Sequence, residues 1–384
     1  MSLNSQKVMM MGAAFAAAFA ATSPASALES KSYVVGWFSH ATNNTPEDCG
    51  PGGPNPTVQD QYIKDLKDLG MSGEEIEALI KERDSNEEGP NRMAEIIRTR
   101  GRIDGKPTNP YMYPSTVKDP EWKSLHGGLA YGFDLDGKGP NQPDSFTHVD
   151  TKQKGIDHKL YTALGCSRPF RGSLEGRPTY WDWLWGQLKD SQPAWIITIT
   201  GEDLSKDGEV TVTFDRALEY LQSNVDGSPR ADVTYRIDAD PRSHNVMKGK
   251  IENGVVTASL TQGSTPDGLF RMFQNPLGMP EFRLHDAKFD FKIRRDGTAD
   301  GFLGGYQPWA DLYFAFASGG QSIEQCIVGD IPGLYYLLKK NADAKPDPKT
   351  GVNSAISAAY YIETVPAFAV PADKAKYDAV ASNR

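Results

Sequence analysis

The chain has 384 residues, of which 39% are hydrophobic and 24% carry a charge, values that are ordinary for a globular protein. Its 41 basic and 50 acidic residues give a formal net charge of -9. This charge argues against binding to nucleic acid, because such proteins need a basic face. At roughly 150 residues per domain, the length predicts two domains.

The first 27 residues have the pattern of a secretory signal peptide. Lys7 supplies a positive charge, and the apolar stretch from Val8 to Ala21 is too short to span a bilayer comfortably. The small residues before Leu28 are typical of a cleavage site, so we expect the mature chain to begin there. No later stretch is long and apolar enough to cross a membrane. We therefore expect an exported, soluble protein that is periplasmic or secreted.

Three cysteines remain in the mature chain, and an exported protein can oxidise them to disulfides. An odd number allows at most one bridge within the chain. Cys49 and Cys166 both lie in polar stretches rich in glycine and proline, so we predict that these two pair. Cys326 lies in an apolar setting, which is typical of a buried, unreactive thiol.

Residues 28–190 are expected to form a region of helices and loops. A short strand is predicted at 33–38, and Ser72 with Glu75 three residues later is typical of a capping box at the start of a helix. The apolar spacing predicts helices within 55–69, 72–83, 91–102 and 156–166.

From residue 193 onward, the apolar residues alternate with a period of two, and Asp-Gly pairs separate the segments, as in β-hairpins. Within this β-rich region we predict one helix at 215–223 and another after Gly320. The apolar segment 355–370 is expected to pack back on the sheet. The predicted fold is α+β, in which a helix- and loop-rich N-terminal half (28–190) packs on an antiparallel β-rich C-terminal half with a C-terminal helix (191–384).

The stretch of residues 132–166 is rich in aspartate and glycine. Its Asp-x-Asp-Gly motif resembles the start of a calcium loop, in which alternating carboxylates surround the ion. An EF-hand is excluded, because the third aspartate is missing and position 12 of the loop is Ser145. We predict a calcium loop of another kind, and the alternative is a set of solvated turns. The candidate carboxylate ligands are Asp134, Asp136, Asp144, Asp150 and Asp157.

Histidines in the same stretch suggest a second kind of metal site. If His126, His148 and His158 converge, their imidazoles and an aspartate would suit zinc, copper or iron. Their spacing matches no zinc motif, and single histidines are more often surface or hydrogen-bonding residues. His148 and His158 are nevertheless candidate ligands beside the aspartates. The alternative function is therefore a metal-dependent exported enzyme, a hydrolase or a redox enzyme, with its site within residues 126–158.

Two further sites have weaker support. Cys166 beside Ser167 would act as a nucleophile only with a histidine such as His158 close by. The tryptophan-rich stretch 177–187 would suit a sugar platform, although such residues more often belong to a core. The sequence assigns no reaction. We expect the β-rich half to bind an unidentified small molecule or protein partner.

Overall fold

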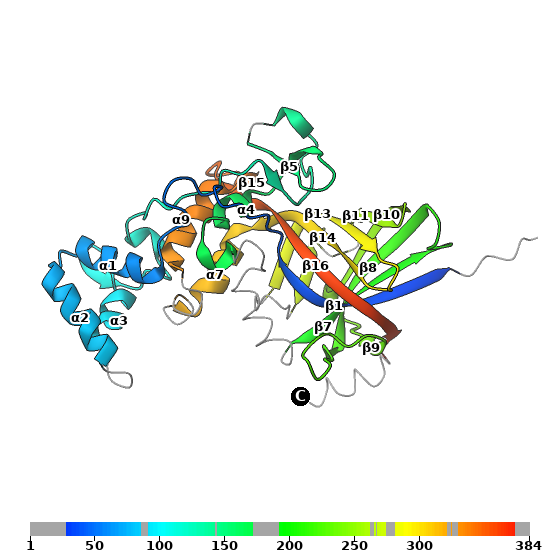
Figure 1. Ribbon diagram of the computed structural model, residues 1–384, viewed down its shortest axis with the longest axis horizontal. Helices are drawn as coiled ribbons and strands as arrows, with labels where there is room; N and C mark the ends of the chain where they lie inside the picture. Colours follow the sequence, from blue (N-terminus) through cyan, green and yellow to red (C-terminus); the bar gives the residue numbers. More distant parts are fainter. Residues whose placement is uncertain are drawn as a thin grey trace, which may run out of the picture.

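The computed structural model describes residues 28–85, 91–142, 144–171, 192–261, 265, 267–273, 281–320, 324 and 329–372. The predicted signal peptide, Cys326 and the tryptophan-rich stretch 177–187 lie outside these residues. Figure 1 shows long strands gathered on one side of the molecule, helices on the other, and a small lobe around β5 that projects at the top of the view.

Eight antiparallel strands close into a barrel, because the first and last of them also pair with each other. The closing contact runs from Ser32↔Ala367 to His40↔Tyr360. In hydrogen-bonding order the strands are β1 (Glu29–His40), β7 (Pro193–Gly201), β8 (Gly208–Tyr220), β10 (His244–Glu252), β11 (Val255–Leu260), β13 (Glu281–Ile293), β14 (Ala299–Pro308) and β16 (Asn353–Pro371).

Shorter strands extend this sheet or form small sheets of their own. β9 (Val233–Ile237) pairs with β16 and β8, β12 (Phe270–Phe273) with β13, and β15 (Ala344–Pro346) with β16. The two small sheets consist of β2 (Gly101–Ile103) with β3 (Lys106–Thr108), and of β4 (Leu129–Ala130), β5 (Phe146–His148) and β6 (Lys154–Ile156).

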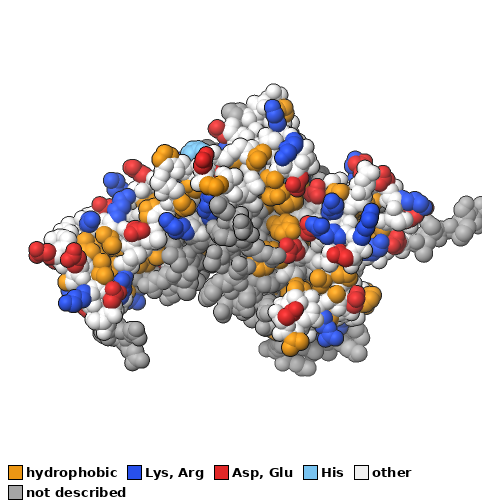
Figure 2. Space-filling view, viewed as in Figure 1, with side chains coloured by type: hydrophobic (Ala, Val, Ile, Leu, Met, Phe, Trp, Pro, Cys, Tyr) orange, Lys and Arg blue, Asp and Glu red, His pale blue; other side chains and the backbone are white. Residues whose placement is uncertain are grey.

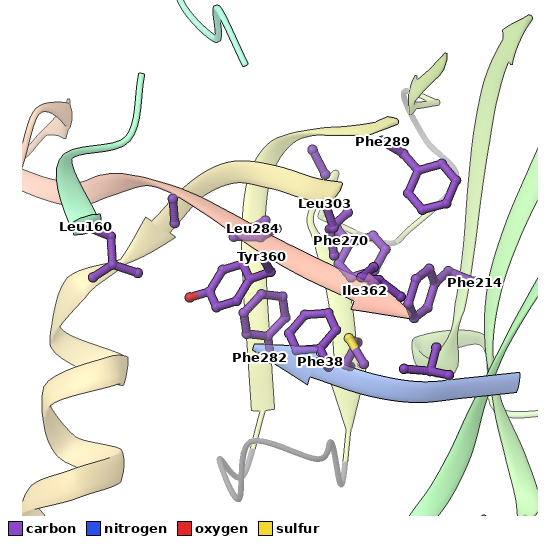
Figure 3. Packing of buried hydrophobic residues seen from close by; sticks show 14 of the residues in the cluster. Phe38, Leu160, Phe214, Phe270, Phe282, Leu284, Phe289, Leu303, Tyr360 and Ile362 are labelled. Atoms are coloured by element: carbon purple, nitrogen blue, oxygen red, sulfur yellow. The ribbon is translucent and has the colours of Figure 1, made fainter. Parts of the chain in front are cut away.

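The barrel interior is filled by aromatic and aliphatic side chains from alternating strand positions (Figure 3). The ring of Tyr360 stacks on Phe38 at 5.2 Å between centroids and meets the edge of Phe282 at 4.9 Å. Burying each such side chain stabilises the fold by about 1.5–3 kcal/mol. The alternation of apolar and polar residues in the sequence therefore reflects barrel strands whose side chains point in turn to the dry interior and to the solvated outer face.

The helices lie outside the barrel. α1 (Val58–Asp68), α2 (Gly73–Ser85) and α3 (Arg92–Arg98) share a small apolar core of their own. The capping box predicted at Ser72 and Glu75 is confirmed, since each side chain accepts the other residue's backbone N–H, at 2.7 and 3.3 Å. The other helices are α4 (Lys159–Leu164), α5 (Arg168–Arg171), α7 (Trp309–Ala317), α9 (Ile331–Asn341) and the short 3₁₀ turns η1 (Pro114–Thr116), η2 (Gly139–Asn141) and η3 (Pro241–Ser243).

The predicted division into a helix- and loop-rich half and a β-rich half is wrong. The described chain is mostly antiparallel β, and its barrel cannot close without β1, which comes from the N-terminal residues and lies between β7 and β16. The helix predicted at 215–223 is also wrong, because Asp215–Tyr220 continue β8. Pairing with β7 outweighs the local helix propensity of these residues.

Candidate functional site

The acidic loop, residues 131–157, lies along the outward side of β14. The ring of Tyr131 stacks on Phe302, with centroids 4.8 Å apart. Phe133 lies over Gly304, where an added Cβ would meet the Phe133 ring at only 2.3 Å. Because side chains on one face of a strand recur every second residue, the next outward position of β14 is Tyr306. The absence of a side chain at Gly304 lets the loop approach the barrel wall directly.

Three carboxylates of this loop converge. Asp134, Asp136 and Asp157 each place one oxygen within 4.8 Å of the others. Asp157 is only 4% exposed, and its carboxylate accepts the backbone N–H of Leu135 at 2.7 Å and that of Asp136 at 3.3 Å. Asp134 accepts the N–H of Gly137 at 2.8 Å. The loop backbone therefore holds the acids in place instead of leaving them as free surface groups.

The three carboxylates do not share one protonation behaviour. Burial raises the pKa of Asp157 above its usual value, and the negative charge of Asp136 adds to this effect. Partial burial also acts to raise the pKa of Asp136, but the ammonium of Lys138, 2.8 Å away, more than offsets it, so that this pKa is lowered. Of these two acids, Asp157 is thus the one that gains a proton first as the pH falls.

The strands beneath the loop add two more oxygen groups. Asp343 is held by the N–H and hydroxyl of Ser357, each at 2.7 Å, and burial raises its pKa. Tyr306, the register partner of Ser357, is 8% exposed, and its hydroxyl has no hydrogen-bond partner among the described residues. Burial raises the pKa of Tyr306, and the negative charges of Asp157, Asp136 and Asp343 raise it further.

The other predicted ligands lie outside this group. Asp144 occupies a turn with φ of 63°, and Asp150 is exposed. The Nδ1 atom of His148 accepts the N–H groups of Asp150 and Thr151, at 3.1 and 3.2 Å, and its ring packs against Tyr131.

The histidines do not meet. His158 is buried beside the start of α4, and its Nε2 donates to the carbonyl of Ala41 at 3.0 Å. Burial lowers the pKa of His158 to about 4, so its imidazole is neutral at ordinary pH. His126 is exposed. Across the described ranges, the group of three or more potential ligands that lie close enough for one ion consists of aspartates alone.

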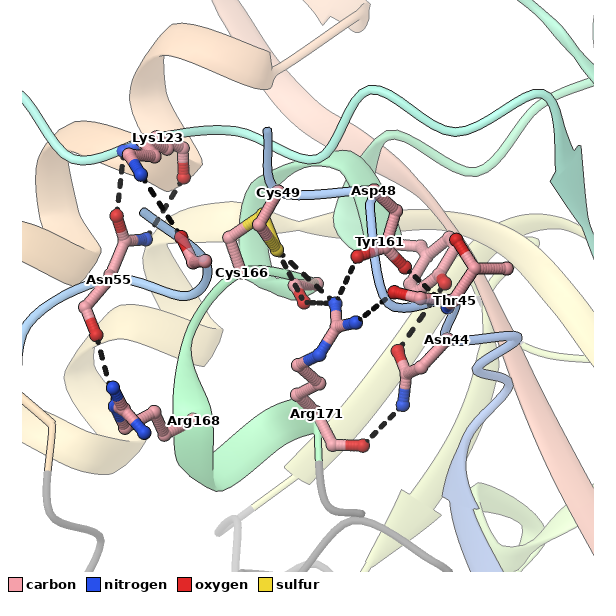
Figure 4. Close-up of a disulfide and its surroundings, with 12 residues drawn as sticks. Asn44, Thr45, Asp48, Cys49, Asn55, Lys123, Tyr161, Cys166, Arg168 and Arg171 are labelled. Atoms are coloured by element: carbon pink, nitrogen blue, oxygen red, sulfur yellow. Dashed lines mark hydrogen bonds and ion pairs between the residues drawn. A yellow bond between two sulfur atoms is a disulfide. The ribbon is translucent and has the colours of Figure 1, made fainter. Parts of the chain in front are cut away.

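The predicted disulfide between Cys49 and Cys166 is confirmed (Figure 4). Beside it, the Arg171 guanidinium donates to the carbonyl of Gly165 at 3.0 Å and pairs with Asp48 at 2.5 Å. The bridge joins the start of the chain's loop region to the end of the acid-rich stretch. A disulfide is consistent with an oxidising compartment.

Sequence reasoning missed Asp343 and Tyr306 as neighbours of the acidic loop, because both are distant from it in the chain. A signal that could have found them is the Gly304-Gly305 pair, because glycine in a strand permits another segment to approach the backbone closely. The structure shows that the approaching segment is the acidic loop, through the ring of Phe133.

A second cluster of carboxylates lies between the small helices and the rest of the molecule. The guanidinium of Arg100, whose side chain is 1% exposed, contacts Asp65 at 2.7 Å, Asp330 at 2.8 Å and Glu324 at 3.2 Å. The hydroxyls of Tyr62 and Tyr111 both donate to Glu324 at 2.6 Å. This network joins α1 and α3 to the N-terminus of α9.

Fold and site together define a closed eight-stranded antiparallel barrel with a carboxylate-lined loop on its outer wall. Comparison of the chain with family models, with curated proteins and with solved structures gives no match. Among the helices of the described residues, none combines the length and the apolar character needed to cross a membrane.

Proposed function

We propose that this is an exported protein whose acidic loop binds one hard divalent cation, calcium, through Asp134, Asp136 and Asp157. The observation that carries the proposal is the convergence of three carboxylate oxygens within 4.8 Å of one another, one of them from the buried Asp157. The signal-like N-terminus and the disulfide support export.

The chemistry of the donors favours calcium over a transition metal. Calcium takes six to eight oxygen ligands in a flexible geometry, and carboxylates with a neutral hydroxyl and water suit it. Zinc, copper and iron prefer sites with imidazole or thiolate ligands, and both His148 and His158 are engaged elsewhere. The exposed ammonium of Lys138 forms an ion pair with the carboxylate of Asp136, so a cation that binds this carboxylate has to displace the ammonium.

The role that we propose for the ion is structural. Fixing a loop costs about 1–2 kcal/mol per residue in conformational entropy, and residues 131–157 contain little regular structure. A cation that ties Asp134 and Asp136 to Asp157 closes this loop on itself over β14. No reaction is assigned to the site.

Calcium titration of the chain from Leu28 onward, purified and stripped with a chelator, tests the proposal. We expect calorimetry to give about one calcium per chain, and a rise of about 2.7 kcal/mol in the free energy of unfolding at a hundred times the dissociation constant. Asp157→Asn should abolish both effects, because it removes the central carboxylate.

Asp150→Asn is the matched control, since it makes the same change in the same loop at an exposed residue outside the cluster. It should bind calcium as the unmodified chain does. Lys138→Met should bind more tightly, because it removes the competing ammonium. The proposal fails if the unmodified chain takes up no calcium, or if Asp150→Asn and Asp157→Asn lower the affinity equally. Stoichiometric zinc or copper uptake would instead support the enzyme alternative.

A further inference from the structure

A groove of about 490 Å³ lies between the acidic loop and the outer wall of the barrel. The loop contributes residues such as Asp134, His148 and Gln153 to one side of it. Strands β10, β11, β13 and β14 form most of its floor, and Glu209 of β8, the register partner of Lys250, adds a carboxylate at one edge. In Figure 2, basic side chains gather over the part of the barrel where Figure 1 labels β10 and β11.

The strand registers place the floor residues in two rows that cross the barrel wall. The first row contains Lys248, Ser259 and Lys288, which are direct partners on β10, β11 and β13. With neighbouring strands about 4.8 Å apart, the backbones of the two lysines are about 10 Å apart, with a serine hydroxyl between them. An anion lying over Ser259 is within reach of both ammonium groups.

The two ammonium groups of this row form no direct ion pair among the described residues, although the charge of Lys288 also acts on the nearby Asp136. Among the described residues, neither Lys248 nor Lys288 lies within ion-pair distance of a carboxylate. Lys248 donates to the hydroxyl of Thr211 at 2.6 Å, and Lys288 donates to the backbone carbonyl of Asp134. Each ammonium has three donors, so each retains two for a ligand.

The second row offers acceptors and an aromatic edge. It contains Lys250, Thr257, Asp290 and Phe302 on the same four strands. Lys250 is already paired with Glu252 at 2.7 Å, whereas the carboxylate of Asp290 has no partner among the described residues. Asp290 and Thr257 can bind hydroxyl groups, and Phe302 closes the end of the row with an apolar surface.

We propose that this groove binds an acidic saccharide, with its carboxylate on Lys248 and Lys288 and its hydroxyls on Asp290 and Thr257. A ligand that carries anionic groups, many hydroxyls and apolar ring faces matches the two rows together. A neutral sugar leaves the ammonium pair without an anion, and a simple dicarboxylate makes no use of the second row. The site goes beyond the proposed calcium loop, and the lysines act without the ion.

Isothermal titration of the chain from Leu28 onward with trigalacturonate, at low ionic strength and in the presence of a chelator, tests the proposal. We expect saturable binding that weakens about tenfold in Lys248→Gln, because one charge-assisted hydrogen bond is lost. Lys248 is exposed, and its hydrogen bond within the described residues goes to the hydroxyl of Thr211, so its replacement should leave the loop and the fold in place. Asp290→Asn should weaken binding of trigalacturonate without creating binding of a neutral sugar.

Lys292→Gln is the control, because Lys292 is an exposed lysine of β13, the strand of Lys288, and does not line the groove. It should bind trigalacturonate as the unmodified chain does. The proposal is overturned if trigalacturonate does not bind, if Lys292→Gln weakens binding as much as Lys248→Gln, or if maltotriose or tartrate binds equally well. Because a chelator is present throughout, these outcomes do not depend on whether the loop takes up calcium.

Discussion

Two regions of this molecule each bring three carboxylates together, and they balance the charge in different ways. In the cluster between α1, α3 and α9, a buried guanidinium of the chain itself touches Asp65, Glu324 and Asp330. In the acidic loop, no ion pair joins an arginine to these acids within the described part of the chain, and Lys138, which pairs with Asp136, is exposed to solvent. One cluster has a permanent internal cation, whereas the other leaves its carboxylates accessible to a cation from solution.

The comparison also explains the different burial of the two clusters. A buried ion is costly unless a partner and additional hydrogen bonds compensate it. Glu324 satisfies this condition with two tyrosine hydroxyls, the N–H of Ile331 at 2.9 Å and Arg100. Asp134 and Asp136 remain near the surface, where water and ions reach them. The first arrangement suits a fixed joint between elements, and the second suits a site that an ion enters and leaves.

The largest expected effect comes from removing the internal cation. Arg100→Met should lower the free energy of unfolding by about 3–5 kcal/mol, because it leaves three carboxylates without their buried partner. Urea denaturation followed by circular dichroism measures this loss. Arg102→Met is the control, since Arg102 is exposed and bonds only to backbone carbonyls nearby. A loss of less than about 1 kcal/mol in Arg100→Met would mean that the network does not hold the helices to the barrel.

The second prediction concerns the pH dependence of the exchangeable site. Calcium requires deprotonated ligands, and Asp157 has a raised pKa because it is buried. The calcium affinity should therefore be constant at high pH and fall as the pH drops through this raised pKa, by up to roughly tenfold per pH unit. The fall should begin above the value of about 3.9 that is usual for an aspartate.

Calorimetry with calcium over a series of pH values measures this dependence. Replacing Asp144, an acid of the same loop outside the cluster, with asparagine should leave the pH profile unchanged. An affinity that stays constant down to the ordinary aspartate pKa would show that Asp157 is not a ligand.

The sequence predicted the components of the acidic loop better than their surroundings. The Asp-x-Asp-Gly motif and Asp157 were identified because carboxylate spacing is a local property. Asp144 and His148 satisfy the same local criteria, yet turns direct them elsewhere. Tyr306 joins the cluster through strand register, a long-range property that no local pattern encodes.

The prediction of the fold had the same limit, because local patterns identify strands but not their pairing. The strands after residue 193 were recognised because each alternates between apolar and polar residues. β1 was recognised only as a short strand at 33–38, and its place between β7 and β16 depends on pairing with residues more than 150 positions away. The helices α1 to α3 are present, but they pack in a small core of their own outside the barrel. Their clear sequence patterns led to the prediction of a helical N-terminal half, although the main body of the molecule is a barrel.

The smallest expected effect tests whether a proton completes the charge balance of the Arg100 cluster. One guanidinium faces three acids there, and burial together with the charge of Glu324 raises the pKa of Asp330, while Arg100 opposes this shift. A raised pKa in the folded state stabilises the fold below the ordinary carboxyl pKa of about 3.9, and this contribution is lost as the pH rises through the folded-state value. Asparagine mimics the protonated acid and cannot lose a proton.

Asp330→Asn should therefore change the free energy of unfolding by less than about 1 kcal/mol near pH 5, and its stability should decline less than that of the unmodified chain as the pH rises. Asparagine also keeps the cap that Asp330 forms on α9, where the side chain accepts the N–H of Gly333 at 2.7 Å. Asp330→Ala loses that cap and should cost about 1 kcal/mol or more. Denaturation of the three proteins at several pH values measures the difference. If Asp330→Asn destabilises the fold as strongly as Arg100→Met, Asp330 is ionised, and the cluster holds its excess negative charge without a proton.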